Sequence, residues 1–132
     1  MSTCSPEQPD CGPCGERKKG RAWKIQAGAY FKRSLKIRRV ATGGSFNLTG
    51  YGVRCYFRKV KYDYAETQTA TATCTIVDAA TGRVDIILGA TTTRLMVDTG
   101  FWDVEVYKLD DLDEVYRVLQ GTYSVDLEVT TL

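Results

Sequence analysis

Apolar and polar residues alternate along most of the chain from Trp23 onward, in short stretches that turn signals separate. Residues at every second position of a strand share one face, so each stretch predicts a half-buried β-strand. Turns fall about every 8–12 residues, which is typical of a β-sandwich. We therefore expect an all-β fold, an antiparallel β-sandwich of about seven to eight strands. The expected strands lie within residues 23–27, 31–37, 53–58, 71–76, 84–88, 102–107 and 116–129.

Short polar segments mark the expected connections between these strands. Residues 42–45 (TGGS) and 78–83 (DAATGR) predict tight turns, and Gly82 can take the positive φ that such turns often need. Residues 110–114 (DDLDE) predict an acidic turn, and residues 90–96 (ATTTRLM) predict a short helical turn between the sheets. Residues 61–68 (KYDYAETQ) predict a loop or a hairpin.

The first 20 residues differ in character from the rest of the chain. They contain all three prolines, three of the five cysteines and no periodic pattern. A Pro/Gly-rich segment of this kind predicts an extended arm rather than an element of a packed domain. The chain of 132 residues suits one domain of ordinary size. We therefore expect an arm over residues 1–22 and a β-sandwich domain over residues 23–132.

Charge is distributed unevenly along the chain. Residues 1–40 hold ten basic and three acidic residues, and residues 41–132 hold eight and thirteen. A basic leading segment on an acidic body can mediate contact between subunits, with one copy's arm on another copy's body. The alternative is a solvated basic edge strand, because lysine prevents sheet edges from pairing with other chains. Nucleic acid is not expected as a partner, since no known binding module is present and the acidic body would repel phosphate.

Membrane insertion and secretion are not expected either. No apolar run approaches the roughly 20 residues that a membrane helix needs. The first 20 residues lack the apolar stretch of a secretory signal, so synthesis in the cytoplasm is the expectation.

The sequence contains few candidate catalytic residues. Histidine is absent, which removes the commonest general base and the usual partner of a nucleophilic serine or cysteine. We therefore expect no enzyme. Carboxylates gather at Asp110, Asp111, Asp113 and Glu114, but the spacing lacks the glycine and distal glutamate of a Ca²⁺ loop. A solvated turn is the preferred interpretation of this cluster.

The cysteines fall into two groups. Cys55 and Cys74 lie on the inward faces of expected strands, where core packing is the usual role and a disulfide is the alternative. Cys4, Cys11 and Cys14 form C-x6-C-G-P-C in the arm. The arm lacks the βαβ context of a thioredoxin motif, which leaves Zn²⁺ or an iron–sulfur cluster, a disulfide clamp, or idle thiols. A metal site would need a fourth ligand from elsewhere.

Two segments of the chain are candidate interfaces. One is the basic part of the arm, and the other is a basic-aromatic stretch in which tyrosines occur among Arg54, Arg58, Lys59 and Lys61. Tyrosine and arginine are enriched at protein interfaces, and the acidic body favours a protein partner over nucleic acid. The candidate interface residues are Arg17, Lys18, Lys19, Arg21, Tyr56, Tyr62 and Tyr64.

Several short motifs follow one another at a spacing found in tailed-bacteriophage proteins. They are Leu48, Thr49 and Gly50; Asp78 and Gly82; Gly100, Trp102, Asp103 and Val104; and Gly121, Tyr123 and Val125. The ordered set resembles the N-terminal domain of the phage baseplate upper protein family over residues 23–130. The Cys-rich arm is a departure from that pattern.

The resemblance implies an immunoglobulin-like sandwich and a structural role in the virion. Such a protein would be a component of the tail or baseplate, or an adaptor for fibre attachment. Its partners would be other tail, baseplate or fibre proteins, with further copies of itself in a symmetric assembly. Two alternative functions stay open: a metal or redox protein acting through Cys4, Cys11 and Cys14, and a module that binds carbohydrate on the host surface.

Overall fold

The chain folds almost entirely into β-strands, with one short helix. The structure is a computed structural model, and it describes residues 9–10, 22–39, 42–59 and 70–127. The elements are β1 (Pro9–Asp10), β2 (Trp23–Gln26), β3 (Phe31–Lys36), β4 (Arg38–Arg39), β5 (Tyr51–Arg58), β6 (Ala70–Thr71), β7 (Thr73–Asp78), β8 (Arg83–Leu88), α1 (Ala90–Arg94), β9 (Thr99–Lys108) and β10 (Asp111–Asp126). The all-β prediction is confirmed.

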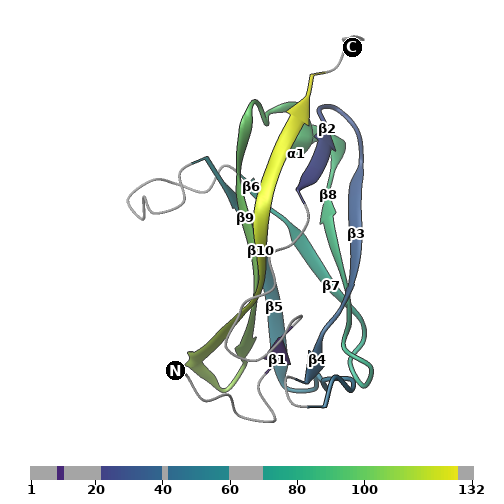
Figure 1. The fold of residues 1–132 in the computed structure, drawn as a ribbon, viewed down its shortest axis with the longest axis vertical. Coiled ribbons are helices and arrows are strands. Elements are labelled where there is room, and N and C mark those ends of the chain that lie inside the picture. The colour runs from purple at the N-terminus through teal and green to yellow at the C-terminus, as the bar shows by residue number, and fades with distance from the viewer. Residues whose placement is uncertain (1–8, 11–21, 40–41, 60–69, 128–132) are drawn as a thin grey trace.

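Two sheets form the two layers of the molecule (Figure 1). The larger sheet has the order β2-β10-β9-β5-β6, and the smaller has the order β3-β8-β7. The sheets are antiparallel except at one edge, where β2 runs parallel to β10 with Trp23 beside Tyr123. The prediction of a fully antiparallel arrangement is therefore wrong at β2. The two-residue strands β1 and β4 pair separately.

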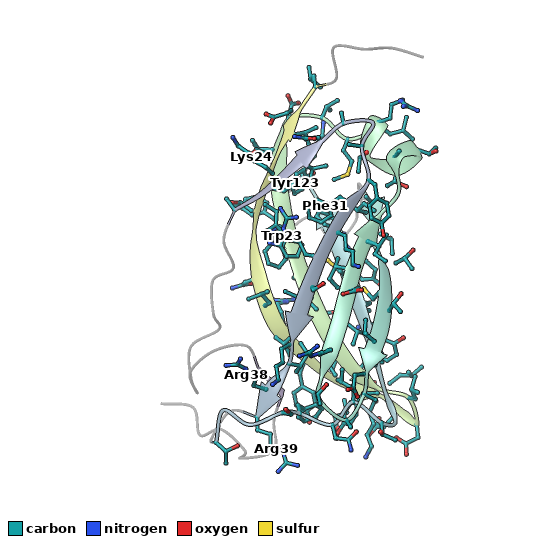
Figure 2. All side chains as sticks on the ribbon, turned by 90° about the vertical axis from the view of Figure 1, so that its right-hand side faces the viewer. Trp23, Lys24, Phe31, Arg38, Arg39 and Tyr123 are labelled. Atoms are coloured by element: carbon teal, nitrogen blue, oxygen red, sulfur yellow. The ribbon has the colours of Figure 1, made fainter. Side chains whose placement is uncertain are left out.

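The core lies between the two sheets and is rich in aromatic rings. Trp23 and Trp102 stack with ring centroids 3.5 Å apart and planes 5° apart. Phe31 of the smaller sheet meets Trp23 at 5.5 Å and Phe57 at 6.4 Å. Figure 2 shows Trp23, Phe31 and Tyr123 close together in the upper half of the domain. These contacts join the two layers. Burial of one face of each sheet against the other is the main source of stability in a two-layer fold.

Alternation along the strands correctly predicted most of the core. Val84, Ile86 and Leu88 of β8 are buried, as are Trp102, Val104 and Val106 of β9. Leu127 is an exception at the end of the last expected strand, because β10 ends at Asp126 and the Leu127 side chain is 70% exposed. Phe46 and Leu48 are buried although they lie outside strands. Val129 lies outside the described residues.

The connections differ from expectation at the acidic segment. The turn between β9 and β10 consists of Leu109 and Asp110, and β10 already begins at Asp111. β10 is 16 residues long, and its register with β9 shifts at two points along its length. A bulge of this kind bends a strand and increases its local twist. The short helical turn was predicted correctly and is α1.

Little of the expected arm is described. Pro9–Asp10 pair with Arg38–Arg39 of the same chain, and the remaining residues up to 21 lie outside the described part. The division into an arm and a domain therefore stays a prediction. Among the described residues, no helix has the length and apolar character needed to span a membrane.

Candidate protein-interaction surface

The outward side of the larger sheet carries a dense set of aromatic and charged side chains. Along β9, alternate residues from Gly100 to Val106 are buried, so the residues between them face outward. The register brings outward residues of β5 and β10 beside them. We call this surface the tyrosine–arginine face. It consists of Arg54, Tyr56, Arg58, Phe101, Asp103, Glu105, Tyr107, Val115 and Arg117.

Charged side chains cross this face in one row. Glu105 lies opposite Arg54 on one side and Arg117 on the other. The Arg54 Nε donates a hydrogen bond to Glu105 Oε1 at 2.8 Å, and Arg117 Nη2 lies 3.7 Å from Glu105 Oε2. Arg117 Nε also lies 3.2 Å from Asp103 Oδ2. One carboxylate thus bridges two guanidinium groups, which holds three strands in register and limits the freedom of both arginines.

Aromatic rings flank the first of these arginines. The Arg54 guanidinium lies 5.0 Å from the ring centre of Tyr107 and 5.9 Å from that of Tyr56. Such cation–π contacts stabilise a planar guanidinium against a ring. Gly52 lies beneath the Tyr107 ring, and a Cβ at position 52 would overlap the ring atoms where they now stand. The absent side chain therefore lets the Tyr107 ring lie close to the sheet.

Burial and neighbouring charges shift two acid–base groups on the face. Partial burial would lower the pKa of Arg54, but the hydrogen bond and the charge of Glu105 outweigh it and raise this pKa. Burial and, secondarily, the charge of Glu105 raise the pKa of Asp103, and the charge of Arg117 only partly opposes them. Arg54 therefore stays charged at any physiological pH. The face offers ordered rings and guanidinium groups, the residue types that dominate binding energy at protein interfaces.

The sequence predicted only part of this face. Tyr56 is a predicted interface residue and lies on it, and Arg54 and Arg58 were noted beside it. Tyr107 and Arg117 were missed, because their place beside β5 depends on a strand register that alternation alone does not fix. The other predicted interface residues lie outside the described residues: Arg17, Lys18, Lys19, Arg21, Tyr62 and Tyr64.

The cysteines of the domain are free thiols. Cys55 is fully buried on β5, and Cys74 is half-buried against the core on β7. Core packing is confirmed, and the alternative disulfide between them is not formed. Burial raises the pKa of Cys55 well above its ordinary value and that of Cys74 to about 11. Both thiols are therefore protonated and unreactive at neutral pH.

Metal ligands are not assembled in the described part of the chain. No group of three or more Cys, Asp or Glu side chains converges there, and Asp110, Asp111, Asp113 and Glu114 are within it. Cys4, Cys11 and Cys14 lie outside the described residues, so Zn²⁺ or iron–sulfur binding by them stays a prediction.

Comparison with known proteins finds a structural likeness and no sequence relative. No protein-family model matches the chain, and no curated protein sequence does. The major fimbrial subunit AggA of Escherichia coli aligns with a TM-score of 0.33 at 10% identity, over 80% of this chain and 91% of that one, which is too low to support an argument. The N-terminal domain of phage TP901-1 ORF48 aligns with a TM-score of 0.51 at 12% identity, over 86% of this chain and 92% of that one. The resemblance predicted from the sequence is thus confirmed at the level of the fold: this chain is similar in fold to the N-terminal domain of a phage protein.

Proposed function

We propose that this protein is a non-enzymatic structural component of a tailed-bacteriophage particle. Its place would be the tail or baseplate, where it would hold other virion proteins or attach fibres. The observation that carries the proposal is the similarity of nearly the whole described fold to the N-terminal domain of phage TP901-1 ORF48. The protein would be made in the host cytoplasm and act in the finished virion.

The strand order supports an immunoglobulin-like classification of the fold. Immunoglobulin sandwiches place strands G, F, C and C′ in one sheet and strands B, E and D in the other. The orders β10-β9-β5-β6 and β3-β8-β7 follow that arrangement if β3 is taken as strand B and β10 as strand G. β2 departs from it by pairing in parallel with β10 instead of joining β3.

The tyrosine–arginine face supports a role in holding other proteins. The Arg54 guanidinium is held by Glu105 and by the flanking rings of Tyr56 and Tyr107 before any partner binds. A surface that is ordered in advance loses less side-chain entropy on binding. The expected partners are other tail, baseplate or fibre proteins, together with further copies of this chain in a symmetric assembly. The arm of residues 1–22, with Arg17, Lys18, Lys19 and Arg21, would supply a second contact.

The experiment that tests this proposal replaces the chain in a phage that encodes it with an Arg54→Ser/Tyr56→Ser variant. Purified particles are then assayed for the variant by quantitative mass spectrometry. We expect the variant to be depleted from particles although its circular dichroism matches that of the wild type. Tyr30→Ser is the matched control, since Tyr30 is 63% exposed and lies away from the face. Normal incorporation of the face variant would remove the face from the proposal, and absence of the wild-type chain from particles would overturn the proposal itself.

A further inference from the structure

β7 (Thr73–Asp78) is an edge strand of the smaller sheet. Among the described residues it pairs with β8 alone, and the strand order β3-β8-β7 leaves its other side open. The backbone groups that an edge strand does not give to its neighbour point away from the sheet, where a further strand can pair with them. Only the start of β7 is tied to the larger sheet, because the N–H of Ala72 donates to the Cys55 carbonyl oxygen at 3.0 Å. Beyond that point β7 slants away from β5 (Figure 1).

The side chains of β7 contain nothing that would keep a further strand away. Residues 73–77 (TCTIV) include no charge, glycine or proline, and Thr, Ile and Val are residues that favour strands. Thr73, Thr75 and Val77 are exposed on the outward side, and Val77 is 57% exposed. Cys74 and Ile76 pack against the core. The open edge is therefore neutral and largely β-branched.

The other sheet edges in the described part of the chain carry protection that β7 lacks. Proteins protect open edges with charged side chains, lysine above all, or with very short strands. β6 has two residues, and each of the other open edges includes charge. The charged residues are Lys24 on β2, Lys32 and Lys36 on β3, Arg54 on β5, and Glu114 and Arg117 on β10. β7 is thus the edge most open to pairing.

A second copy of β7 fits this edge. Two copies can pair antiparallel about a two-fold axis that passes through Thr75, the middle of residues 73–77. Directly opposite residues of an antiparallel pair lie on one face of the sheet. Thr75 then faces the same residue of the second copy, Thr73 faces Val77, and Cys74 faces Ile76 on the core side. No like charges meet, because residues 73–77 are uncharged.

We propose that two copies of this chain pair through β7, edge to edge and antiparallel. The two smaller sheets then form one continuous sheet with the order β3-β8-β7-β7-β8-β3. Both strands are already extended before they meet, so little backbone freedom is lost on pairing. The inference rests on the proposed function for its biological setting, a symmetric assembly that holds several copies.

The contact is expected to be weak in solution. Two short strands bury less surface than the roughly 1,000 Å² of a stable interface, and the register of β7 with β8 shifts after Ile76, which limits the regular stretch. The test therefore uses the purified full chain up to millimolar concentration, with a reductant that keeps its thiols reduced. In sedimentation equilibrium, we expect the weight-average mass to rise toward that of two chains and to stop there, because a two-fold contact is closed.

Hydrogen exchange at low and high concentration locates the contact on the unaltered chain. Backbone N–H groups exchange more slowly once they pair with another strand. We expect slower exchange at residues 73–77 in the concentrated sample and no change at residues 31–36, which form the opposite edge of the same sheet. Slowing at residues 31–36 instead would overturn the proposal.

A charge placed on the edge tests the pairing directly. Thr75→Lys sets two lysines opposite each other across the two-fold axis, and we expect association at least about tenfold weaker than that of the wild type. Gln26→Lys is the matched control, since it adds the same charge at an exposed position of the edge strand β2. It should leave association unchanged.

Paired substitutions test the register. Thr73→Lys alone should weaken association, because it puts a charge into a neutral edge. Thr73→Lys/Val77→Glu sets opposite charges face to face at both ends of the paired stretch. This double variant should associate more strongly than Thr73→Lys alone, and added salt should reduce the gain because exposed charges are screened.

Several outcomes would overturn the pairing. A wild-type chain that stays monomeric at millimolar concentration does so, as does growth beyond two chains. Equal association of Thr75→Lys and Gln26→Lys also does so when both keep the wild-type circular dichroism, and the exchange measurement on the wild type decides if Thr75→Lys fails to fold. A double variant no stronger than Thr73→Lys excludes the register centred on Thr75. Incorporation into particles is measured separately and decides the proposed function.

Discussion

Gly82 occupies a turn position that no other residue can fill without displacing backbone. Its φ is +74°, and a Cβ there would overlap the carbonyl oxygen of Ile37 and lie 2.8 Å from that of Phe46. Gly50 has a similar φ of +84° but open space around a Cβ. Substitutions at the two glycines therefore distinguish the cost of a left-handed backbone conformation from the cost of steric overlap.

We predict that Gly82→Ala destabilises the fold more than Gly50→Ala does. Gly50→Ala should lower the free energy of unfolding by about 1–2 kcal/mol, the cost of a left-handed conformation for an L residue. Gly82→Ala should lower it by about 3 kcal/mol or more, because backbone must also move. Urea unfolding followed by tryptophan fluorescence measures both. Equal losses would mean that the turn around Gly82 has room for a side chain.

Cys55 and Cys74 make the stability of the domain depend on pH in the alkaline range. Burial raises both thiol pKa values above the ordinary value of 9.0, that of Cys74 to about 11. Above about pH 9 the unfolded chain loses these protons while the folded chain keeps them. The free energy of unfolding should therefore decrease as pH rises from about 9 to 11. Urea midpoints at pH 8 and pH 10.5 measure this decrease.

The matched control for this pH dependence is Cys55→Ala/Cys74→Ala. It removes the two buried thiols and keeps every other titrating group, so its midpoint should fall less between the two pH values. A decrease of the same size in the variant would assign the effect to other residues, such as the tyrosines.

At the scale of elements, the row of Arg54, Glu105 and Arg117 joins β5, β9 and β10. We predict that Glu105→Gln lowers the free energy of unfolding by about 1–2 kcal/mol, because it leaves two adjacent guanidinium groups without their shared carboxylate. Lys108→Met is the control, since Lys108 lies 4.0 Å from a largely exposed Asp110. It should change stability by less than about 0.5 kcal/mol. A loss from Glu105→Gln no larger than that of the control would show that the row does not stabilise the sheet.

Elements with strict alternation were predicted well, and their pairing was not. β8 and β9 each carry three buried apolar residues at every second position, which is sufficient to identify them. β2 has the same pattern, but alternation carries no information on strand direction, and its parallel pairing with β10 was missed. The composition of the acidic segment predicts a turn, but Asp111 already begins a strand. Exposed hairpin strands tolerate charge, because both of their faces can meet water.

At the scale of the molecule, the tyrosine–arginine face could be predicted only in part, because alternation does not show which strands pair. Tyr56, Arg54 and Arg58 are neighbours in sequence, so the basic-aromatic segment was visible. Glu105 and Arg117 join them only through the register of β5 with β9 and of β9 with β10. Surfaces made of several strands require the tertiary structure.

The most direct test of the central claim is to find the chain in finished particles. Antibodies raised against the purified protein would be applied to intact, purified phage particles and viewed by immunogold electron microscopy. A structural component of the tail or baseplate predicts gold label at the tail, at a constant position from one particle to the next. Particles that carry no label, and that contain none of the chain by mass spectrometry, would contradict it.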